Sequence, residues 1–282
     1  MQLTFTKMHG CGNDFIVIDA RAGPVSLTPA VMQRLADRHF GVGCDQILLL
    51  EPGQDHAAAV RYRIFNADGG EVEQCGNGAR CIARYLQRHG FADSDQIVVD
   101  TSTGLITLYF SDHDEVRVNM GPPRFAPAEI PLKVDAVQDQ YAVIVAERTL
   151  RFRAVSMGNP HAVFQLEDLG VHDINKVPLA MLGPLIQKQS LFPAGVNVGA
   201  MQVLDRQHIR LRVYERGTGE TLACGTGACA AVVAGIQAGV LDNSVTVDLP
   251  GGRLSIEWQG QPDAPVWMTG PAEFVFSGTI EL

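Results

Sequence analysis

A short motif that occurs twice constrains this chain more than any other part of its sequence. Cys75-Gly76-Asn77-Gly78-Ala79 and Cys224-Gly225-Thr226-Gly227-Ala228 each place a cysteine directly before a Gly-x-Gly turn and a run of helical character. The residues ahead of each copy correspond at one common spacing: Arg61, Arg63, Gly70 and Glu71 match Arg210, Arg212, Gly219 and Glu220. This period is much longer than that of a solenoid repeat, and it indicates duplication of a whole domain.

Further correspondences extend the duplication along the chain. Gly158-Asn159 matches Gly12-Asn13, the loop that ends at Asn197 matches the loop that ends at Gln46, and Gly270-Pro271 matches Gly121-Pro122. Strand-like alternation surrounds one long helix in each half. We therefore predict an α+β fold with two homologous domains, each a mostly antiparallel sheet or barrel wrapped around a central helix.

Local signals place the helices. Thr28 is a typical N-cap residue and Pro29 suits the first helical position, so a helix is predicted after them. The helix that follows the second motif is apolar on nearly every side, which favours enclosure by a sheet. Arg80, Arg84 and Arg88 share one face of the helix after the first motif, and we predict that this face meets solvent.

Composition argues against several classes of partner. The 282 residues carry a formal net charge of −9, so nothing would neutralise the phosphates of a nucleic acid or an anionic membrane. The longest apolar run, from Ala228 to Ile236, is too short to span a bilayer, and the N-terminal residues have no apolar core of signal-peptide length. We therefore expect a cytoplasmic protein that binds neither nucleic acid nor membrane.

The six cysteines form neither a disulfide framework nor a metal-binding pattern. Structural disulfides are rare in cytoplasmic chains of this length. There is no C-x-x-C or H-x-x-x-H cluster, and the spacings from Cys75 to Cys81 and from Cys224 to Cys229 are too long for paired zinc ligands. We expect thiols that bind no metal, with a structural role for those outside the two motif cysteines.

A thiol directly before a helix faces unpaired backbone N–H groups and the positive end of the helix dipole. We therefore expect a lowered cysteine pKa, and the same N–H groups can bind a carboxylate. Two such thiols could act on one amino acid: a thiolate removes the Cα proton from one face while the other thiol protonates the opposite face. None of the four lysines lies in a glycine-rich, phosphate-binding context, so a mechanism without cofactor is favoured over pyridoxal phosphate chemistry.

With these motifs the chain resembles the diaminopimelate epimerase family over essentially its whole length. The resemblance also rests on the segments His9 to Phe15, Met157 to His161 and Tyr214 to Gly217. It implies an isomerase that interconverts L,L- and meso-diaminopimelate, on the route to lysine and peptidoglycan, without cofactor or metal. It also implies a substrate cleft between two domains, residues 1–121 with the returning tail 271–282, and residues 122–270.

The resemblance assigns roles to individual residues. Cys75 and Cys224 are implied as the acid/base pair, with His161 and Glu215 as polar groups that support catalysis. The implied substrate contacts are Asn13, Gln46, Asn66, Gly76, Asn77, Asn159, Asn197, Glu215, Arg216, Gly225 and Thr226. A substrate with two amino-acid ends, of which one is inverted and the other recognised, needs a cation, an anion and several amides, and this set supplies them.

The resemblance also implies a homodimer. Family members often have a tyrosine near the C-terminus that contributes to the dimer contact, and the corresponding residue here is Phe276. The difference keeps the aromatic ring and removes the hydroxyl group. We expect a homodimer with Phe276 at its contact.

Three other functions are compatible with parts of the pattern. A proline racemase-like enzyme would share the two thiols, but its smaller pocket would not need Glu215, Arg216 and the asparagines. A thiol–disulfide oxidoreductase would need a resolving cysteine nearby, typically in C-x-x-C, which the sequence lacks. A non-catalytic amino-acid-binding module would need the carboxylate-binding turns but not the thiols.

Overall fold

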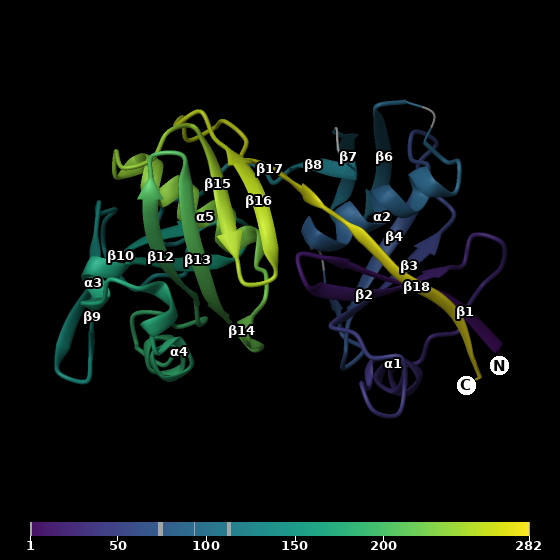
Figure 1. Cartoon of the computed structure of the whole chain (residues 1–282), viewed down its shortest axis with the longest axis horizontal. Coiled ribbons are helices and arrows are strands. Elements are labelled where there is room, and N and C mark those ends of the chain that lie inside the picture. The colour runs from purple at the N-terminus through teal and green to yellow at the C-terminus, as the bar shows by residue number, and fades with distance from the viewer. Residues whose placement is uncertain (1, 73–75, 93, 112–113, 282) are drawn as a thin grey trace. The chain divides into compact units, whose positions relative to one another are not determined.

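The computed structural model describes residues 2–72, 76–92, 94–111 and 114–281. The chain divides into two compact units. Unit 1 comprises residues 1–119 and 269–282, and unit 2 comprises residues 120–268. In Figure 1, unit 1 runs from purple to blue and includes the yellow C-terminal strand, whereas unit 2 runs from teal to yellow-green.

The elements of the two units follow one another in the same order. Unit 1 contains β1 (Gln2–Gly10), β2 (Asn13–Asp19), α1 (Pro29–Ala36), β3 (Gln46–Glu51), β4 (Val60–Asn66), β5 (Glu71–Val72), α2 (Gly76–Arg88), β6 (Gln96–Thr101), β7 (Gly104–Phe110), β8 (Glu115–Asn119) and the returning β18 (Glu273–Glu281). Unit 2 contains β9 (Tyr141–Val145), β10 (Arg148–Ser156), β11 (Pro160–Gln165), α3 (Leu166–Leu169), the 3-10 helix η2 (Ile174–Lys176), α4 (Leu179–Gln187), β12 (Asn197–Asp205), β13 (His208–Glu215), β14 (Gly219–Thr221), α5 (Gly225–Gln237), β15 (Ser244–Leu249) and β16 (Gly252–Glu257). β17 (Trp267–Pro271) contains the boundary between the units.

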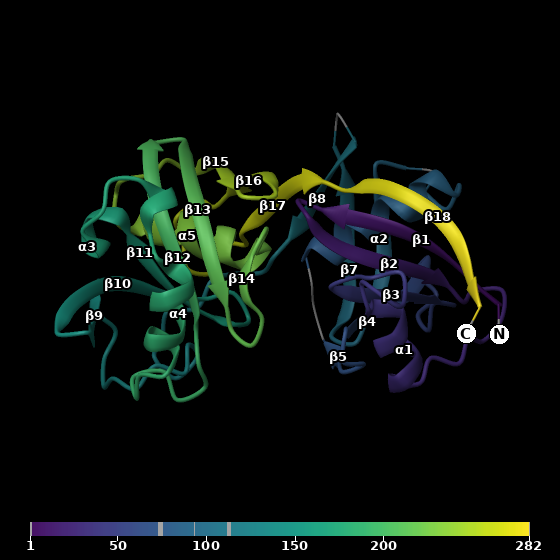
Figure 2. The same cartoon turned by 60° about the horizontal axis from the view of Figure 1, so that its bottom comes forward.

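Both units use the same strand pairings, as a duplicated domain should. In unit 1, β1–β2 is antiparallel, β2–β3 parallel, β3–β4 antiparallel and β4–β6 parallel. In unit 2, β10–β11, β11–β12, β12–β13 and β13–β15 repeat these directions. An antiparallel neighbour completes each set, β18 beside β1 (Figure 2) and β9 beside β10. The predicted α+β fold of two homologous domains is confirmed.

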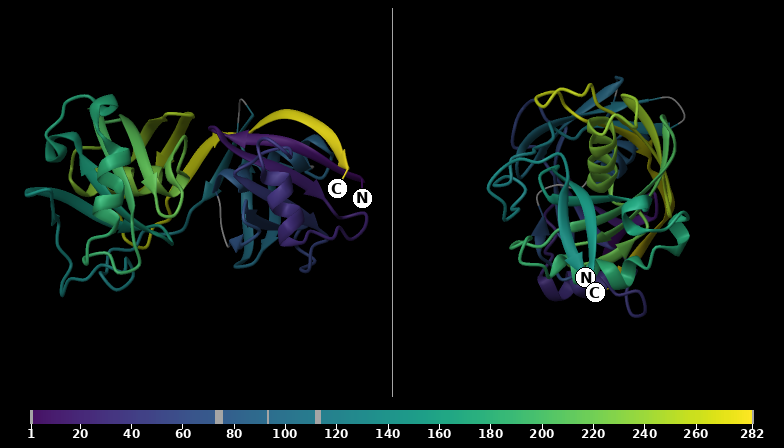
Figure 3. Two further views of the ribbon diagram at one scale, coloured as in Figure 1. Left: turned by 90° about the horizontal axis from the view of Figure 1, so that it is seen from below. Right: turned by 90° about the vertical axis from the view of Figure 1, so that its left-hand side faces the viewer.

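Each unit encloses one long helix. Nearly every residue of α5 from Gly225 to Gly235 is buried, and the helix packs against β10, β11, β12, β13 and β16. The right-hand view of Figure 3 shows α5, in yellow-green, among the strands. In unit 1, α2 buries Ala79, Ile82, Ala83 and Leu86. No helix of the described residues is both long enough and apolar enough to cross a membrane.

Part of the arginine face of α2 packs against other parts of unit 1. The prediction that this face meets solvent was wrong for Arg80, whereas Arg84 is partly buried and Arg88 is exposed as predicted. Arg80 is fully buried, and its Nε donates to the carbonyl oxygen of Pro271 at 3.1 Å. Arg84 forms an ion pair with Asp114 at 2.7 Å, and the guanidinium of Arg88 lies 4.3 Å above the ring of Phe274. The C-terminal segment returns along this face, a long-range contact that the local pattern of α2 does not encode.

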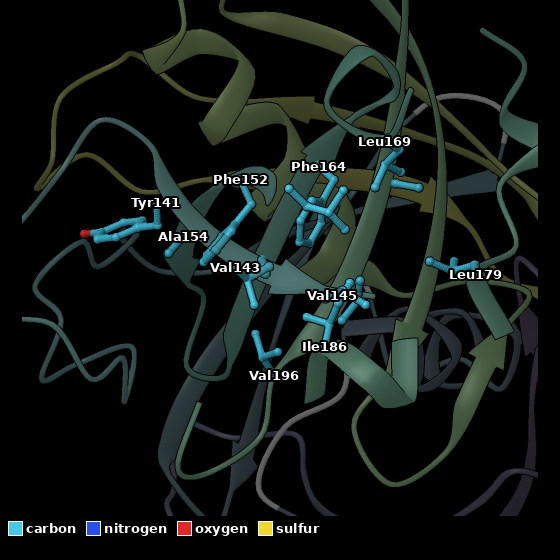
Figure 4. Packing of buried hydrophobic residues seen from close by; sticks show 14 of the residues in the cluster. Tyr141, Val143, Val145, Phe152, Ala154, Phe164, Leu169, Leu179, Ile186 and Val196 are labelled. Carbon is cyan, nitrogen blue, oxygen red and sulfur yellow. The ribbon is translucent and has the colours of Figure 1, made fainter. Parts of the chain in front are cut away.

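A second core covers the other side of each sheet. In unit 2, α3 and α4 pack over strand residues such as Phe152 and Phe164, whose ring centroids are 5.3 Å apart (Figure 4). In unit 1, α1 begins as predicted, with Thr28 accepting a hydrogen bond from the Val31 N–H, and buries Leu35 in the equivalent core. Strands such as β2 and β3 are therefore buried on both faces, which explains their continuous apolar runs.

A substitution at Gly183 tests the packing of α4 against the end of β13. A Cβ at this position would lie 2.4 Å from Cγ of Tyr214. An alanine normally stabilises a helix interior by about 1 kcal/mol relative to glycine, but overpacking costs about 1–3 kcal/mol. We therefore expect Gly183→Ala to lower the free energy of unfolding in a denaturant titration. Gly23→Ala is the control, because nothing lies within 4 Å of that Cβ; a more stable Gly183→Ala variant would contradict the packing.

Candidate active site

The second motif folds where strand ends meet the N-terminus of α5. Cys224 is the N-cap residue of this helix and is only 4% exposed. Gly227, one turn along, leaves room for the thiol, because a Cβ there would lie 3.2 Å from Cys224 Sγ and 3.0 Å from Val213 Cγ2. The close approach of these side chains to the helix backbone thus favours glycine at this position of the motif.

The Cys224 thiol donates a hydrogen bond to a carboxylate. Sγ lies 3.1 Å from Oε2 of Glu215 at the end of β13, and Oε1 of Glu215 accepts from the Thr221 hydroxyl at 2.6 Å. Burial, and then the negative charge of Glu215, raise the pKa of Cys224 well above its usual value. The expectation of a lowered pKa is wrong for this cysteine, because burial and the carboxylate outweigh the helix N-terminus.

His161 lies within β11 and is 1% exposed. Burial, and then the positive charge of Arg216, lower the pKa of His161 to about 3. The imidazole is therefore neutral near pH 7. Its Nε2 lies 2.9 Å from Oδ1 of Asn159, and because an amide oxygen can only accept, Nε2 carries the proton and donates it to this bond.

Asn197 connects β11 with the loop that follows β13. It lies beside His161 in the parallel pairing of β11 and β12. Its Nδ2 donates to the carbonyl oxygen of Pro160 at 3.1 Å, and its Oδ1 accepts from the Arg216 N–H at 2.8 Å. The Arg216 side chain donates to the carbonyl oxygen of Ala194 at 2.8 Å. Asn197 therefore fixes the backbone from which Arg216 projects.

Unit 1 gathers its predicted residues at the corresponding end of its own sheet. Gln46 begins β3 opposite Asn66 at the end of β4, and its Nε2 donates to Asn66 Oδ1 at 2.9 Å. Asn77, in the first turn of α2, donates through Nδ2 to Asn13 Oδ1 at 3.1 Å. Gly76 is the first residue of α2. Cys75 lies outside the described residues.

Corresponding positions of the two units carry different chemistry. Phe15 lies opposite Gln46 in β2–β3, whereas His161 lies opposite Asn197 in β11–β12. Asn66 ends β4, whereas Glu215 ends β13. Unit 2 thus has an imidazole and a carboxylate where unit 1 has a phenyl ring and an amide.

Thr221 and Asp45 also touch predicted site residues, although neither was predicted from the sequence. Thr221 holds Glu215, and Asp45 accepts a hydrogen bond from Nδ2 of Asn13 at 2.9 Å. Each differs from its counterpart in the other half, where Val72 and Val196 stand, and this difference was a usable signal. Among the residues that the structure describes, no group of three or more His, Cys, Asp or Glu side chains could hold a metal ion.

Comparisons with known proteins agree with the duplicated fold. The family model for diaminopimelate epimerase matches residues 5–126 and 153–275. The diaminopimelate epimerase of Nitrosomonas eutropha is 56% identical over 285 residues, with 100% of both chains covered. That of Nitrosospira multiformis is 56% identical over 282 residues, which cover 100% of this chain and 99% of the relative.

Solved structures with low identity support the fold alone. A hydroxyproline epimerase from Agrobacterium vitis has a TM-score of 0.71 at 15% identity, with 99% of this chain and 92% of that chain covered. A phenazine biosynthesis protein of the PhzF family from Bacillus anthracis has a TM-score of 0.69 at 16% identity, with 100% of both chains covered.

The buried His161 predicts a specific pH dependence of stability. Its pKa falls from 6.5 to about 3 on folding, so between these values the unfolded chain binds a proton that the folded chain does not. Stability is therefore lost as pH falls through this window, by up to about 1.4 kcal/mol per pH unit. We expect His161→Gln to remove this component in urea titrations between pH 7 and pH 4. His56→Gln, at an exposed site, should retain the wild-type slope; the same slope in His161→Gln would refute the assignment.

The contact between Glu215 and Cys224 predicts how the pKa of Cys224 changes when the carboxylate is replaced. Removing its charge should lower the Cys224 pKa, because the thiolate would no longer face an anion. We expect this shift in Glu215→Gln, measured by NMR of protein labelled at cysteine Cβ, with the Cys224 signal assigned from Cys224→Ser. Glu220→Gln is the matched control, since Glu220 pairs with Arg212 at 2.6 Å instead. An unchanged or higher Cys224 pKa in Glu215→Gln would contradict the role of the carboxylate.

Proposed function

This chain belongs to the diaminopimelate epimerase family, and we propose from this premise that it interconverts L,L- and meso-diaminopimelate with Cys75 and Cys224 as its acid/base pair. It is an isomerase that acts on a small-molecule substrate. The hydrogen bond from the Cys224 thiol to Glu215 carries the proposal, because it holds a proton on sulfur at the N-terminus of α5. A proline racemase-like function is supported by the fold alone.

The reaction needs two groups of opposite protonation state. In one direction, a thiolate at Cys75 takes the Cα proton while the Cys224 thiol delivers its proton to the opposite face of the same carbon. In the other direction, the two thiols exchange these roles. The charge that develops on the substrate carboxylate is stabilised by backbone N–H groups at the helix N-termini, in the turns Gly76-Asn77 and Gly225-Thr226.

The polar side chains distinguish the two ends of the substrate. The guanidinium of Arg216 has five N–H donors, and those beyond its bond to Ala194 bind the distal carboxylate. Oδ1 of Asn159 accepts a hydrogen bond from His161, and Nδ2 of Asn159 donates to the substrate. Glu215 also faces the substrate. The remaining contacts come from Asn13, Gln46, Asn66, Asn77 and Asn197.

We also propose a homodimer that forms through β18, where Phe276 is 50% exposed and Val275 is 53% exposed. The Phe276 ring contacts Phe5 edge to face, with centroids 5.9 Å apart, so the aromatic surface is held in place without a hydroxyl group. A cytoplasmic location suits an acid/base pair that must stay reduced.

The proposed function is tested with purified protein, L,L-diaminopimelate, and no added pyridoxal phosphate or metal. We expect formation of the meso isomer, and a loss of about 10²–10⁴-fold in kcat for Cys75→Ser and for Cys224→Ser. Cys229→Ala is the control, because Cys229 is buried further along the same helix, α5. No conversion by the wild type would refute the function, and wild-type activity in either serine variant would refute the two-thiol mechanism.

A further inference from the structure

A directed chain of hydrogen bonds runs from Asp45 to the first turn of α2. Oδ2 of Asp45 accepts from Nδ2 of Asn13 at 2.9 Å, and Oδ1 of Asn13 accepts from Nδ2 of Asn77 at 3.1 Å. A carboxylate can only accept, whereas an asparagine amide donates at one end and accepts at the other. The Asp45 carboxylate therefore fixes the orientation of both side-chain amides.

Asp45 is itself fixed by charged neighbours. Nη2 of Arg38 donates to Oδ1 of Asp45 and to Oδ1 of Asp14, both at 2.8 Å. The Asp14 N–H donates to Asp45 Oδ2 at 3.2 Å, and the Asp45 N–H donates to Asp14 Oδ1 at 2.9 Å. On the far side, Lys7 donates to Asp14 Oδ2 and to the carbonyl oxygen of Gly43. Two cations and two anions thus alternate around the start of β2 and β3, and they leave Asp45 little freedom to turn.

The chain of hydrogen bonds ends at a buried acceptor atom on Asn77. Asn77 is 3% exposed, and its Oδ1 is buried without a hydrogen-bond partner in the part of the chain that the structure describes. A buried acceptor without a hydrogen-bond partner is destabilising, so a donor that arrives with a ligand would relieve this cost. Asn77 belongs to the first turn of α2, whose N–H groups attract a carboxylate. An α-amino acid brings both a carboxylate and an ammonium donor.

Unit 2 fixes its corresponding asparagine by other means. Val196 stands where unit 1 has Asp45, and Thr226 stands where it has Asn77. Asn159, which corresponds to Asn13, is held instead by the neutral imidazole of His161. The carboxylate-directed chain of bonds is therefore one of the differences by which the two halves can present different groups to one substrate.

We propose that Asp45, held by Arg38, is a positioning residue that orients Asn13 and Asn77 so that Oδ1 of Asn77 accepts a hydrogen bond from the ammonium group of the amino-acid substrate. This inference rests on the proposed function and names the atom that recognises the ammonium group. Asp45 touches neither the substrate nor the reacting carbon, so its effect is on binding.

Asp45→Asn tests the proposal with almost no change in volume. An amide at position 45 can offer either a donor or an acceptor to Asn13, so the orientation of both asparagines is no longer fixed. We expect KM for diaminopimelate to rise about tenfold, while kcat changes less than threefold. The matched control is Asp37→Asn. Asp37 accepts hydrogen bonds from the N–H groups of His39 and Phe40 in the same loop, but it does not touch Asn13. Its KM should stay within twofold of the wild type.

Pimelate, the same seven-carbon diacid without ammonium groups, separates orientation of Asn77 from general damage. The inhibition constant of pimelate as a competitive inhibitor should change less than twofold in Asp45→Asn. An equal rise in this constant and in KM would overturn the proposal, as would an unchanged KM in an active Asp45→Asn enzyme. The latter result leaves the proposed function intact, whereas an inactive wild type would refute the proposed function itself.

Discussion

The hydrogen bond from the Cys224 thiol to Glu215 is the interaction on which this account depends. It forms because β13 ends beside the N-terminus of α5, and because Thr221 holds the second carboxylate oxygen. Burial and the carboxylate keep the proton on sulfur, while the helix N-terminus stabilises the thiolate that remains once the proton has left. These opposing influences suit a group that must give up a proton in one direction and take one in the other.

Duplication supplies two similar scaffolds, and substitution makes them electrostatically different. Arg80 is fully buried in α2, where its Nη1 lies 3.5 Å from the carbonyl oxygen of Gly76, whereas Cys229 stands at the corresponding place in α5. Glu215 ends β13, whereas Asn66 ends β4. A buried positive charge thus lies at the start of one motif helix and a negative charge at the start of the other. This difference fits a pair of thiols of which one holds a proton while the other does not.

The sequence predicted those features that depend on local pattern or on repetition. The apolar residues around α5 required enclosure, Thr28 and Pro29 marked the start of α1, and the repeated motif implied repeated strand pairing. Features that depend on contacts between distant segments were not predictable. The burial of Arg80 depends on the segment that returns at Pro271, and the raised pKa of Cys224 depends on its distance from Glu215 and on exclusion of water. The bonds of Asp45 to Asn13 and Arg38 likewise depend on how β2 and β3 align. The surroundings of Cys75 remain a prediction.

Hydrogen transfer in D₂O tests the central claim, that two thiols act on opposite faces of one carbon. The reaction is started from each isomer in turn, stopped at low conversion, and the deuterium content of substrate and product is measured by mass spectrometry. The donating thiol carries solvent deuterium and differs from the group that removes the proton. We therefore predict a product with one deuterium at Cα and a remaining substrate without label. A product that keeps the original protium would contradict it, because a single base would then have carried the same hydrogen from one face to the other.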